Sequence, residues 1–419
     1  MDYINTLSTF LLFFVVVLTL KHLWIKFNQG GFSVVMPLIA VSFIFLVLPI
    51  VLDFLIGKPD FTKYKGFNTA SKSIEIDIVY NLYITFVFLM FRNYLKKCNT
   101  PKIIFSSKIF FDTAYKYRYL LWFLMLLPIL AVLFSNDPSL YLNYKANQLF
   151  LDRTFKDSHV FVGKSVLISI FAASLLFYLL KNKASSSLLF PKYILYLILF
   201  FVIFWVDGKR GVLVKYLFLL LISGWFFGEI KPSILIRRIF YAISFLVFFV
   251  ISYGKDFAKG NNLYSSFRLN LGRDHTIKYT LFKELIVNEP ILEYRGQSFF
   301  FDLVFFIPRV NWPEKPYPYA VYFVNDVLNL PKKPIGWSFT TCILEEMISN
   351  FGIVGILIAP IFLIKLCKIG DNSSNVFLTL FSIIVSVFFM FTQLTAFMPL
   401  FIVFLFLYIK KANNKIYFQ

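Results

Sequence analysis

Apolar stretches long enough to cross a lipid bilayer recur along almost the whole chain, and one long polar segment, from about Lys255 to Thr341, interrupts them. About 20 helical residues cross the hydrocarbon core, and only helices satisfy their own backbone groups there. Of the 419 residues 59% are apolar and 15% charged, whereas a soluble domain is about half apolar and a quarter charged. The sequence therefore predicts an all-α polytopic integral membrane protein.

About eleven transmembrane helices are predicted, within a range of ten to twelve. They cover residues 4–20, 33–56, 74–91, 118–135, 161–180, 188–206, 211–228, 238–254, 342–364, 376–392 and 397–409. The chain then divides into eight spans in 1–254, one large loop with short amphipathic helices in 255–341, and three spans with a cytoplasmic tail in 342–419. The run Leu7–Leu20 follows no basic residue and precedes no small-residue cleavage site, so we expect a permanent span rather than a signal peptide.

Basic residues in the short loops predict the orientation. One set of alternate short loops holds 20 Lys and Arg, and the opposite set holds nine. The more basic loops are expected in the cytoplasm, which puts the N-terminus and the 255–341 loop outside. The net charge of +20 is explained in the same way, so no nucleic acid partner is expected. Cys98, Cys342 and Cys367 are too few and too scattered for a disulfide framework or a metal site, and no metal or cofactor is predicted.

Acidic residues gather near the predicted outer ends of spans. They are Asp53, Glu75, Asp77, Asp207, Glu345 and Glu346. Ionisable groups at membrane depth are costly and tend to face cavities or partners. A functional cavity that opens outward would explain this asymmetry, and so would a simple tolerance of carboxylates at outer ends.

A tight turn, Asp207-Gly-Lys-Arg-Gly211, joins two predicted spans. It places Lys209 and Arg210 at the membrane surface, where an arginine beside exposed backbone N–H groups suits a phosphate. Cations are less expected in a short outer turn, which favours this function. The alternative is a plain hairpin whose cations reach into the head-group region.

Arg273, Asp274 and His275 form a second candidate group, inside the polar segment. His275 could act as a base near neutral pH, and Asp274 could do the same if it is desolvated. Alternatively, Asp274 caps a helix that the apolar spacing predicts over Thr276–Val287.

A third group follows in the same segment, with Arg295, Arg309 and Lys315 among aromatic residues that include Trp312. Three cations close to head groups suit a diphosphate, while aromatic faces suit sugars. The alternative is a surface segment that binds anionic lipid. The apolar run Ser298–Ile307, which carries Asp302, is too short to span and reads as an interfacial or re-entrant piece.

Two further helices are predicted around this segment. Tyr319–Leu330 has an amphipathic pattern. In the string from Glu345 to Gly355, Glu345, Ser349 and Gly352 share one helix face. A carboxylate at Glu345 would sit at the helix N-terminus, where the dipole favours its charge; capping and close packing alone would explain the same pattern.

Three strings in this order resemble the Wzy-type O-antigen polymerases, which join oligosaccharide repeat units. They are Gly-Lys-Arg-Gly at 208–211, the loop around Arg295 with Ile-Pro-Arg…Trp-Pro-Glu-Lys-Pro at 307–316, and Glu-Glu…Asn-Phe-Gly-Ile-Val-Gly at 345–355. The resemblance covers about residues 190 to 365. One departure is the odd span count with an outer N-terminus, because many members have both ends inside.

The resemblance implies a multi-span, metal-independent enzyme similar to the C-class glycosyltransferases, in the bacterial inner membrane with its active face in the periplasm. Its donor and acceptor would be undecaprenyl-diphosphate-linked glycans, in contact with membrane lipid, and a chain-length regulator protein is an expected partner. Arg210 and the loop arginines would contact the diphosphates. His275, Asp274 and Glu345 compete for the role of base. The alternatives are an O-antigen ligase and a lipid-linked oligosaccharide flippase or other transporter.

Overall fold

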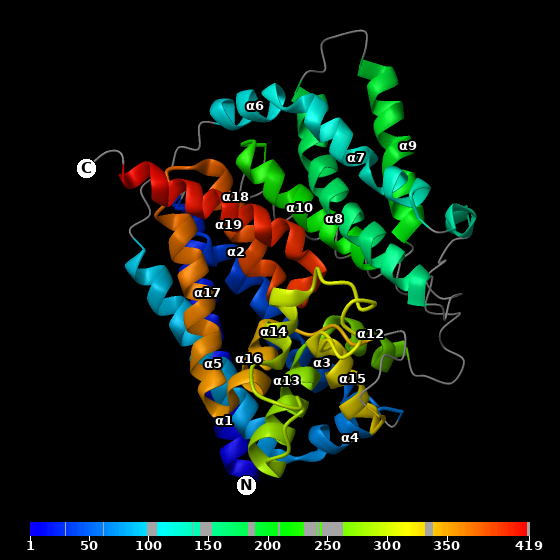
Figure 1. The fold of residues 1–419 in the computed structure, drawn as a ribbon. Coiled ribbons are helices and arrows are strands. Elements are labelled where there is room, and N and C mark those ends of the chain that lie inside the picture. Colours follow the sequence, from blue (N-terminus) through cyan, green and yellow to red (C-terminus); the bar gives the residue numbers. More distant parts are fainter. Residues whose placement is uncertain are drawn as a thin grey trace. The chain divides into compact units, whose positions relative to one another are not determined.

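Helices make up every regular element in the part of the chain that the structure, a computed structural model, describes (Figure 1). The described residues are 1–29, 31–61, 63–98, 107–135, 137–142, 153–182, 189–207, 210–229, 241, 244, 263–331 and 338–416. The chain forms two compact units. One comprises Met1–Lys102, Phe245–Ala396 and Phe404–Gln419, and the other comprises Ile103–Ser244 and Phe397–Val403.

Five helices within the described residues are long and apolar enough to cross a membrane. They are Asp2–Asn28, Val35–Ile56, Ile74–Lys97, Phe161–Asn182 and Ile343–Asp371. A sixth forms if Phe110–Lys116 and Arg118–Leu133, which meet at 64°, are one broken span. These lengths and compositions are those of a helical membrane protein, and each helix overlaps a predicted span. The predicted span 238–254 falls outside the described residues, apart from two single positions.

The first unit contains the N-terminal helices and the polar segment. Its helices are α1 (Asp2–Asn28), α2 (Val35–Ser42), η1 (Phe43–Val47), α3 (Leu48–Ile56), α4 (Lys65–Lys72), α5 (Ile74–Lys97), α12 (Leu263–Leu271), α13 (Asp274–Leu281), η4 (Phe282–Val287), α14 (Gln297–Val304), α15 (Tyr319–Leu328), α16 (Ile343–Phe351), η5 (Gly352–Val354), α17 (Gly355–Asp371) and α18 (Val376–Phe388). The last helix, α19 (Leu394–Ile416), has residues in both units.

Long helices α1 and α17 both pack on α5 (Figure 1). Polar residues fix this packing at two points. Asn81 on α5 donates from Nδ2 to the hydroxyls of Ser8 and Thr9, at 3.1 and 2.9 Å. At the far end of α17, Asp371 accepts from the Ser33 hydroxyl at 2.7 Å and from the Tyr94 hydroxyl at 2.9 Å.

The second unit is built from apolar helices around α8. Its elements are α6 (Ser107–Lys116), α7 (Arg118–Leu133), η2 (Pro138–Leu142), α8 (Arg153–Asn182), α9 (Leu189–Asp207) and α10 (Arg210–Phe226). Small polar side chains on α8 allow close packing and bind its neighbours. Ser169 donates to the Leu124 carbonyl on α7 at 2.6 Å, and Ser174 lies 3.0 Å from the Ser223 hydroxyl on α10.

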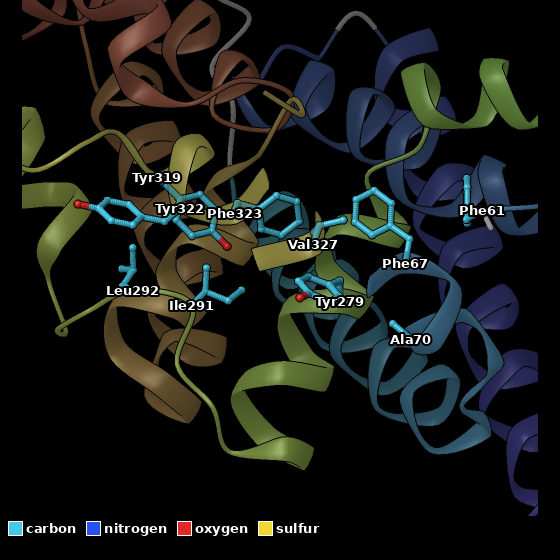
Figure 2. Close-up of a cluster of buried hydrophobic side chains, with 10 residues drawn as sticks. All are labelled: Phe61, Phe67, Ala70, Tyr279, Ile291, Leu292, Tyr319, Tyr322, Phe323 and Val327. Atoms are coloured by element: carbon cyan, nitrogen blue, oxygen red, sulfur yellow. The ribbon is translucent and has the colours of Figure 1, made fainter. Parts of the chain in front are cut away.

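The polar segment has a hydrophobic core of its own (Figure 2). It joins α4 to α13 and α15 and consists of Phe61, Phe67, Ala70, Tyr279, Ile291, Leu292, Tyr319, Tyr322, Phe323 and Val327. Phe67 and Phe323 are both fully buried. Burying such aromatic side chains stabilises the segment without any contact with lipid. The helices predicted at 276–287 and 319–330 are present as α13 with η4 and as α15, whereas α4 lies in residues that we predicted as a plain loop.

Candidate functional site

Arg268 is the centre of a buried ion-pair cluster that joins α12 to α3 and α13. Its side chain is 1% exposed. The guanidinium binds Asp53 through Nε and Nη2 at 2.6 and 2.7 Å, and Asp274 through Nη1 and Nη2 at 3.0 and 2.9 Å. Tyr264 donates its hydroxyl to Asp53 at 2.6 Å. Such two-pronged pairs are the strongest that arginine makes with carboxylates.

This cluster controls the charge of Asp274. Burial, the largest single effect, would raise the pKa of Asp274, but the charge and hydrogen bonds of Arg268 together with the neighbouring His275 outweigh it and hold that pKa well below its usual value. Burial likewise opposes the charge of Arg268, and the Asp274 and Asp53 carboxylates more than offset it, so the pKa of Arg268 is raised. Asp274 is therefore a firmly ionised group whose oxygens are already bound, which makes it a poor proton acceptor. It also does not cap the helix: α13 begins at Asp274, and no side chain caps it.

His275, the next residue, lies against aromatic rings. Its ring centroid is 4.7 Å from that of Phe67 and 5.4 Å from that of Phe61. Burial lowers the pKa of His275, so the ring is neutral near pH 7, although the Asp274 carboxylate opposes this shift. Its Nδ1 lies 3.8 Å from Asp274, too far for a hydrogen bond, and has no other partner among the described residues. In a neutral imidazole the nitrogen that faces a carboxylate carries the proton, so Nε2 is the acceptor nitrogen of this ring.

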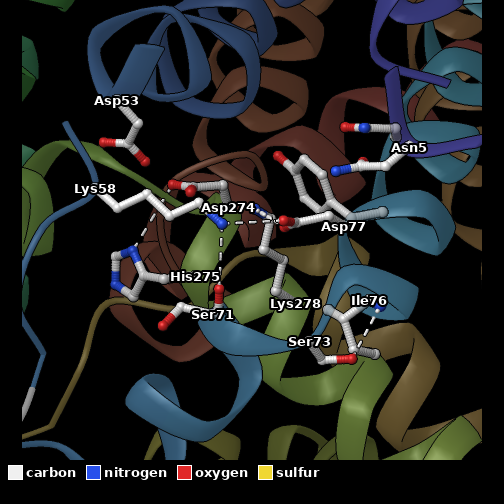
Figure 3. Close-up of polar contacts among 12 residues, drawn as sticks. Asn5, Asp53, Lys58, Ser71, Ser73, Ile76, Asp77, Asp274, His275 and Lys278 are labelled. Carbon is white, nitrogen blue, oxygen red and sulfur yellow. Dashed lines mark hydrogen bonds and ion pairs between the residues drawn. The ribbon is translucent and has the colours of Figure 1, made fainter. Parts of the chain in front are cut away.

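His275 is one of the residues that line a pocket. Figure 3 shows it beside Asp53, Lys58, Asp274 and Lys278 of the same lining. The pocket contains about 380 Å³ of empty space, part of it open to solvent. Its lining combines charged and aromatic side chains: Asp53, Lys58, Pro59, Phe61, Phe67, Ala70, Ser71, Arg268, Asp274, His275 and Lys278. Asp77 on α5 holds the two lysines, with Lys278 at 2.6 Å and the exposed Lys58 at 3.2 Å. Apolar rings beside hydrogen-bonding groups of both signs are the features that bind a polar ligand with an apolar face.

Arg273, just before α13, and Glu345 on α16 are both buried. Arg273 donates from Nη1 to the Gly272 carbonyl at 2.9 Å, and its guanidinium lies 5.4 Å from the Phe45 ring centre. Burial lowers the pKa of Arg273. Glu345 accepts the Cys342 backbone N–H at 2.8 Å, as the first turn of α16 requires. Glu345 therefore caps α16, and its Oε2 has no hydrogen-bond partner in the described part of the chain.

Arg295 is oriented from one side only. Its Nη1 donates to Glu284 Oε2 at 2.5 Å and to the Ser349 carbonyl at 2.7 Å. Burial raises the pKa of Glu284, and the Arg295 charge works against that rise. The Arg295 side chain remains 47% exposed, and its other nitrogens donate to none of the described residues. Gly352 lies beside it at φ +60°, and a Cβ there would be 3.7 Å from Nη2.

Arg309 and Lys315 bind groups of their own loop in this structure. Arg309 donates to the carbonyls of Lys315 and Pro316, at 2.5 and 2.7 Å, and stacks on Tyr317 at 3.9 Å. Lys315 is buried and donates to the Ile307 carbonyl at 2.6 Å. The Trp312 ring contacts Phe300 edge-on at 6.0 Å. These contacts leave Arg309 and Lys315 less available than Arg295 to a ligand.

The basic hairpin falls outside this description. Lys209 and the side chain of Arg210 are not among the described residues, although α10 begins at Arg210. Their diphosphate-binding role stays a prediction.

Several residues of these clusters did not stand out in the sequence. Arg268, Lys58, Lys278 and Glu284 carried no motif, since each depends on a partner far away in the chain. A signal existed for Asp53 and Asp77, which belong to the acidic residues at the outer ends of predicted spans; the structure pairs both with cations of the pocket.

No protein-family model, no curated protein and no solved structure matches the chain. A proposal about its function therefore rests on the residue clusters described above.

Proposed function

We propose that the chain is a membrane glycosyltransferase that polymerises undecaprenyl-diphosphate-linked oligosaccharide repeat units. The enzyme lies in the bacterial inner membrane with about eleven spans, and the 255–341 segment is a periplasmic loop. The growing glycan sits on one lipid diphosphate, and a second lipid-linked repeat unit is the acceptor. A hydroxyl of the acceptor attacks the anomeric carbon of the growing chain, the bond from that carbon to the diphosphate breaks, and the hydroxyl proton passes to a base.

The geometry of Arg295 carries this proposal. A lipid diphosphate gains negative charge as it leaves, and a cation that is already oriented stabilises that charge without reorganisation. Arg295 is fixed through Nη1 by Glu284 and the Ser349 carbonyl, and its exposed nitrogens remain for a ligand. Two parallel N–H donors match two phosphate oxygens. Gly352 lies beside the Nη2 atom.

His275 is the best supported of the three candidate bases. Asp274 is ionised but has its oxygens bound by Arg268, and Glu345 caps α16. His275 is neutral, and Nε2 is the acceptor nitrogen of its ring, as described above. A neutral imidazole can accept the acceptor hydroxyl's proton in the transition state.

The pocket that His275 lines suits a sugar of the repeat unit. Its lining places the aromatic rings of Phe61 and Phe67, which are almost fully buried, beside the polar groups of Lys58, Ser71 and Lys278. The ligand would thus be held by the same combination of ring and hydrogen-bonding contacts that organises other polar ligand sites.

Substitution of Arg295 tests the proposal. In a deletion strain that carries each variant, the surface glycan ladder is measured, and membrane levels of the protein are checked by blot. Arg295→Lys keeps the charge but loses the paired donors, and losing one charge-assisted hydrogen bond costs about 1.5–3 kcal/mol. The rate should fall on the order of tenfold to a hundredfold, and Arg295→Ala should reduce it further.

Arg118 is the matched control, because its guanidinium contacts Tyr115 and Tyr119 of its own segment, stacking on both rings and donating to the Tyr115 carbonyl and the Tyr119 hydroxyl. Arg118→Lys should give a normal ladder. A normal ladder from Arg295→Ala at normal protein level would remove Arg295 from the active site and with it the main support for the proposal. Loss of all glycan beyond the core in the deletion strain, with no single repeat unit retained, would point to a ligase or flippase instead.

A further inference from the structure

A second buried polar cluster lies between α14 and α16, apart from the residues assigned above. We call Ser298, Asp302, Glu346 and Asn350 the oxygen cluster. Ser298 donates its hydroxyl to Glu346 Oε1 at 2.7 Å, and Asn350 donates from Nδ2 to the Ser298 hydroxyl at 2.7 Å. Asp302 follows Ser298 by one turn on α14, so both residues face α16.

Two oxygens of this cluster have no hydrogen-bond partner in the described residues. They are Glu346 Oε2 and Asn350 Oδ1. Glu346 is 2% exposed and Asn350 is fully buried. Both side chains are fixed by their other atoms, since Asn350 Nδ2 also donates to the Glu346 backbone carbonyl at 2.7 Å. Buried polar atoms in native proteins almost always have a partner, so two unpaired acceptors on neighbouring turns of α16 indicate a missing donor or cation.

The charges of the cluster lead to the same conclusion. Glu346 is buried and acts electrostatically on Asp302, and burial together with that charge raises the pKa of Asp302. Two carboxylates in one buried site cannot both stay ionised without a compensating charge. The unpaired atoms are all oxygens, which are ligands for hard cations and for a shared proton.

We propose that the oxygen cluster binds one small monovalent cation, a proton or Na⁺, between Asp302 and Glu346. Ca²⁺ needs six to eight oxygen ligands and Mg²⁺ keeps several waters, whereas only two oxygens of the cluster have no partner among the described residues. A single proton or Na⁺ needs fewer ligands and removes one of the two negative charges. The site would stabilise the packing of α14 on α16, and it would do so whether or not the proposed function is correct.

Other charged groups near the cluster have partners of their own. On α16, Glu345 binds the Cys342 backbone N–H. Arg295 binds Glu284 and the Ser349 carbonyl. Lys315, over the Phe301 ring, donates to the carbonyls of Phe305 and Ile307. Their titration is common to the wild type and to variants of the cluster, and it cancels in the comparison.

Thermal unfolding of the purified protein in detergent tests the proposal. In one arm, NaCl replaces choline chloride at about pH 8.5; in the other, the pH is lowered from about 9 to 6 without Na⁺. A ligand of the folded state alone raises the transition temperature with its concentration. If the occupant is Na⁺, the midpoint rises with NaCl and not with choline chloride. If the occupant is a proton, the midpoint rises as the pH falls, regardless of Na⁺.

Glu346→Gln and Asp302→Asn keep the shape of each side chain but remove its charge, and either change should abolish most of the response. Asp302 is only partly buried, so its variant folds even if Glu346→Gln does not. Glu314→Gln, at an exposed carboxylate in the same segment, should respond like the wild type. A wild type whose midpoint responds to neither Na⁺ nor pH, or variants that respond as strongly as the wild type, would overturn the site.

Discussion

Replacing Arg268 by methionine should strongly destabilise the first unit. Methionine has about the length of the arginine stem but leaves Asp53 and Asp274 without their cation. Asp53 is 18% exposed and keeps its bond from Tyr264, so it can be partly solvated. Asp274 is 3% exposed and loses both of its hydrogen bonds to Arg268.

The magnitude follows mainly from Asp274. Removing one partner of a buried ion pair costs about 3–5 kcal/mol, because the other charge stays buried and uncompensated. Arg268→Lys keeps the charge but loses the two-pronged contacts, and it should cost about 1.5–3 kcal/mol. Replacing both partners, as in Arg268→Met with Asp274→Asn, should cost less than the sum of the single changes by about 0.5–3 kcal/mol.

The pH dependence of the loss gives an independent check. In the wild type the folded-state pKa of Asp274 is depressed, so its stabilising effect is present above the unfolded value of about 3.9 and is lost only as pH falls through the lower folded value. In Arg268→Met, burial without the cation raises the folded-state pKa of Asp274. Its ionisation then destabilises the fold as pH rises above about 3.9, so acidification from about pH 8 to 5 should narrow the gap between variant and wild type.

The assay is thermal unfolding of purified protein in detergent, followed by tryptophan fluorescence. A loss of this size lowers the midpoint by on the order of 10 °C. A midpoint for Arg268→Met within about 2 °C of the wild type, or a gap that widens on acidification, would refute the assignment of Arg268 as the main support of Asp274.

Three further predictions concern other parts of the same unit. Phe323→Ala, in the core of Figure 2, should cost about 3–5 kcal/mol in the same unfolding assay, whereas Phe306→Ala, at an exposed ring, should cost far less; equal losses would contradict the core. Burial lowers the pKa of His275 in the folded state. The contribution of neutral His275 to stability should therefore be fully present above the unfolded-state pKa of about 6.5. It should fall, by up to about 1.4 kcal/mol per pH unit, as the pH drops from that value toward the folded-state pKa. His275→Gln should lack this component, and an unchanged profile in the variant would count against it. A cysteine at the exposed Glu314 should react with an impermeant thiol reagent in intact spheroplasts, and labelling only after lysis would overturn the proposed periplasmic position of the segment.

The sequence predicts a helix correctly where the pattern of apolar residues within that helix is sufficient to locate it. Apolar residues at helical spacing are enough to locate α13 with η4 and α15, and long apolar runs locate the helices of membrane-spanning length. In contrast, α4 has a polar sequence with a glycine, and two of its residues, Phe67 and Ala70, are buried in a core supplied largely by α13 and α15. Tertiary packing here overrides local propensity.

The candidate site shows the same limit. Asp274 was a candidate base or helix cap because His275 and an apolar face follow it directly. The structure gives its oxygens to Arg268, whose other partner, Asp53, is 215 residues away, and no local pattern contains that pairing. Arg309 and Lys315 could be recognised as cations in a proline-rich loop. The atoms that they bind could not be recognised from the sequence, because these atoms are carbonyl oxygens that the turns of the loop leave without other donors.

The Asp53–Arg268 pair also sets an order of events during biosynthesis. Asp53 leaves the ribosome 215 residues before its partner, and at about 5–20 residues per second this is an interval of roughly 10 to 45 s. During that time Asp53, Phe61 and Phe67 lack these later partners, because the residues that contact them have not yet been synthesised. The polar segment therefore closes over the N-terminal helices as a late step of assembly. Chains that stop before Arg268 lack α13 and α15, so Phe61 and Phe67 lose the partners that they have in the core of Figure 2.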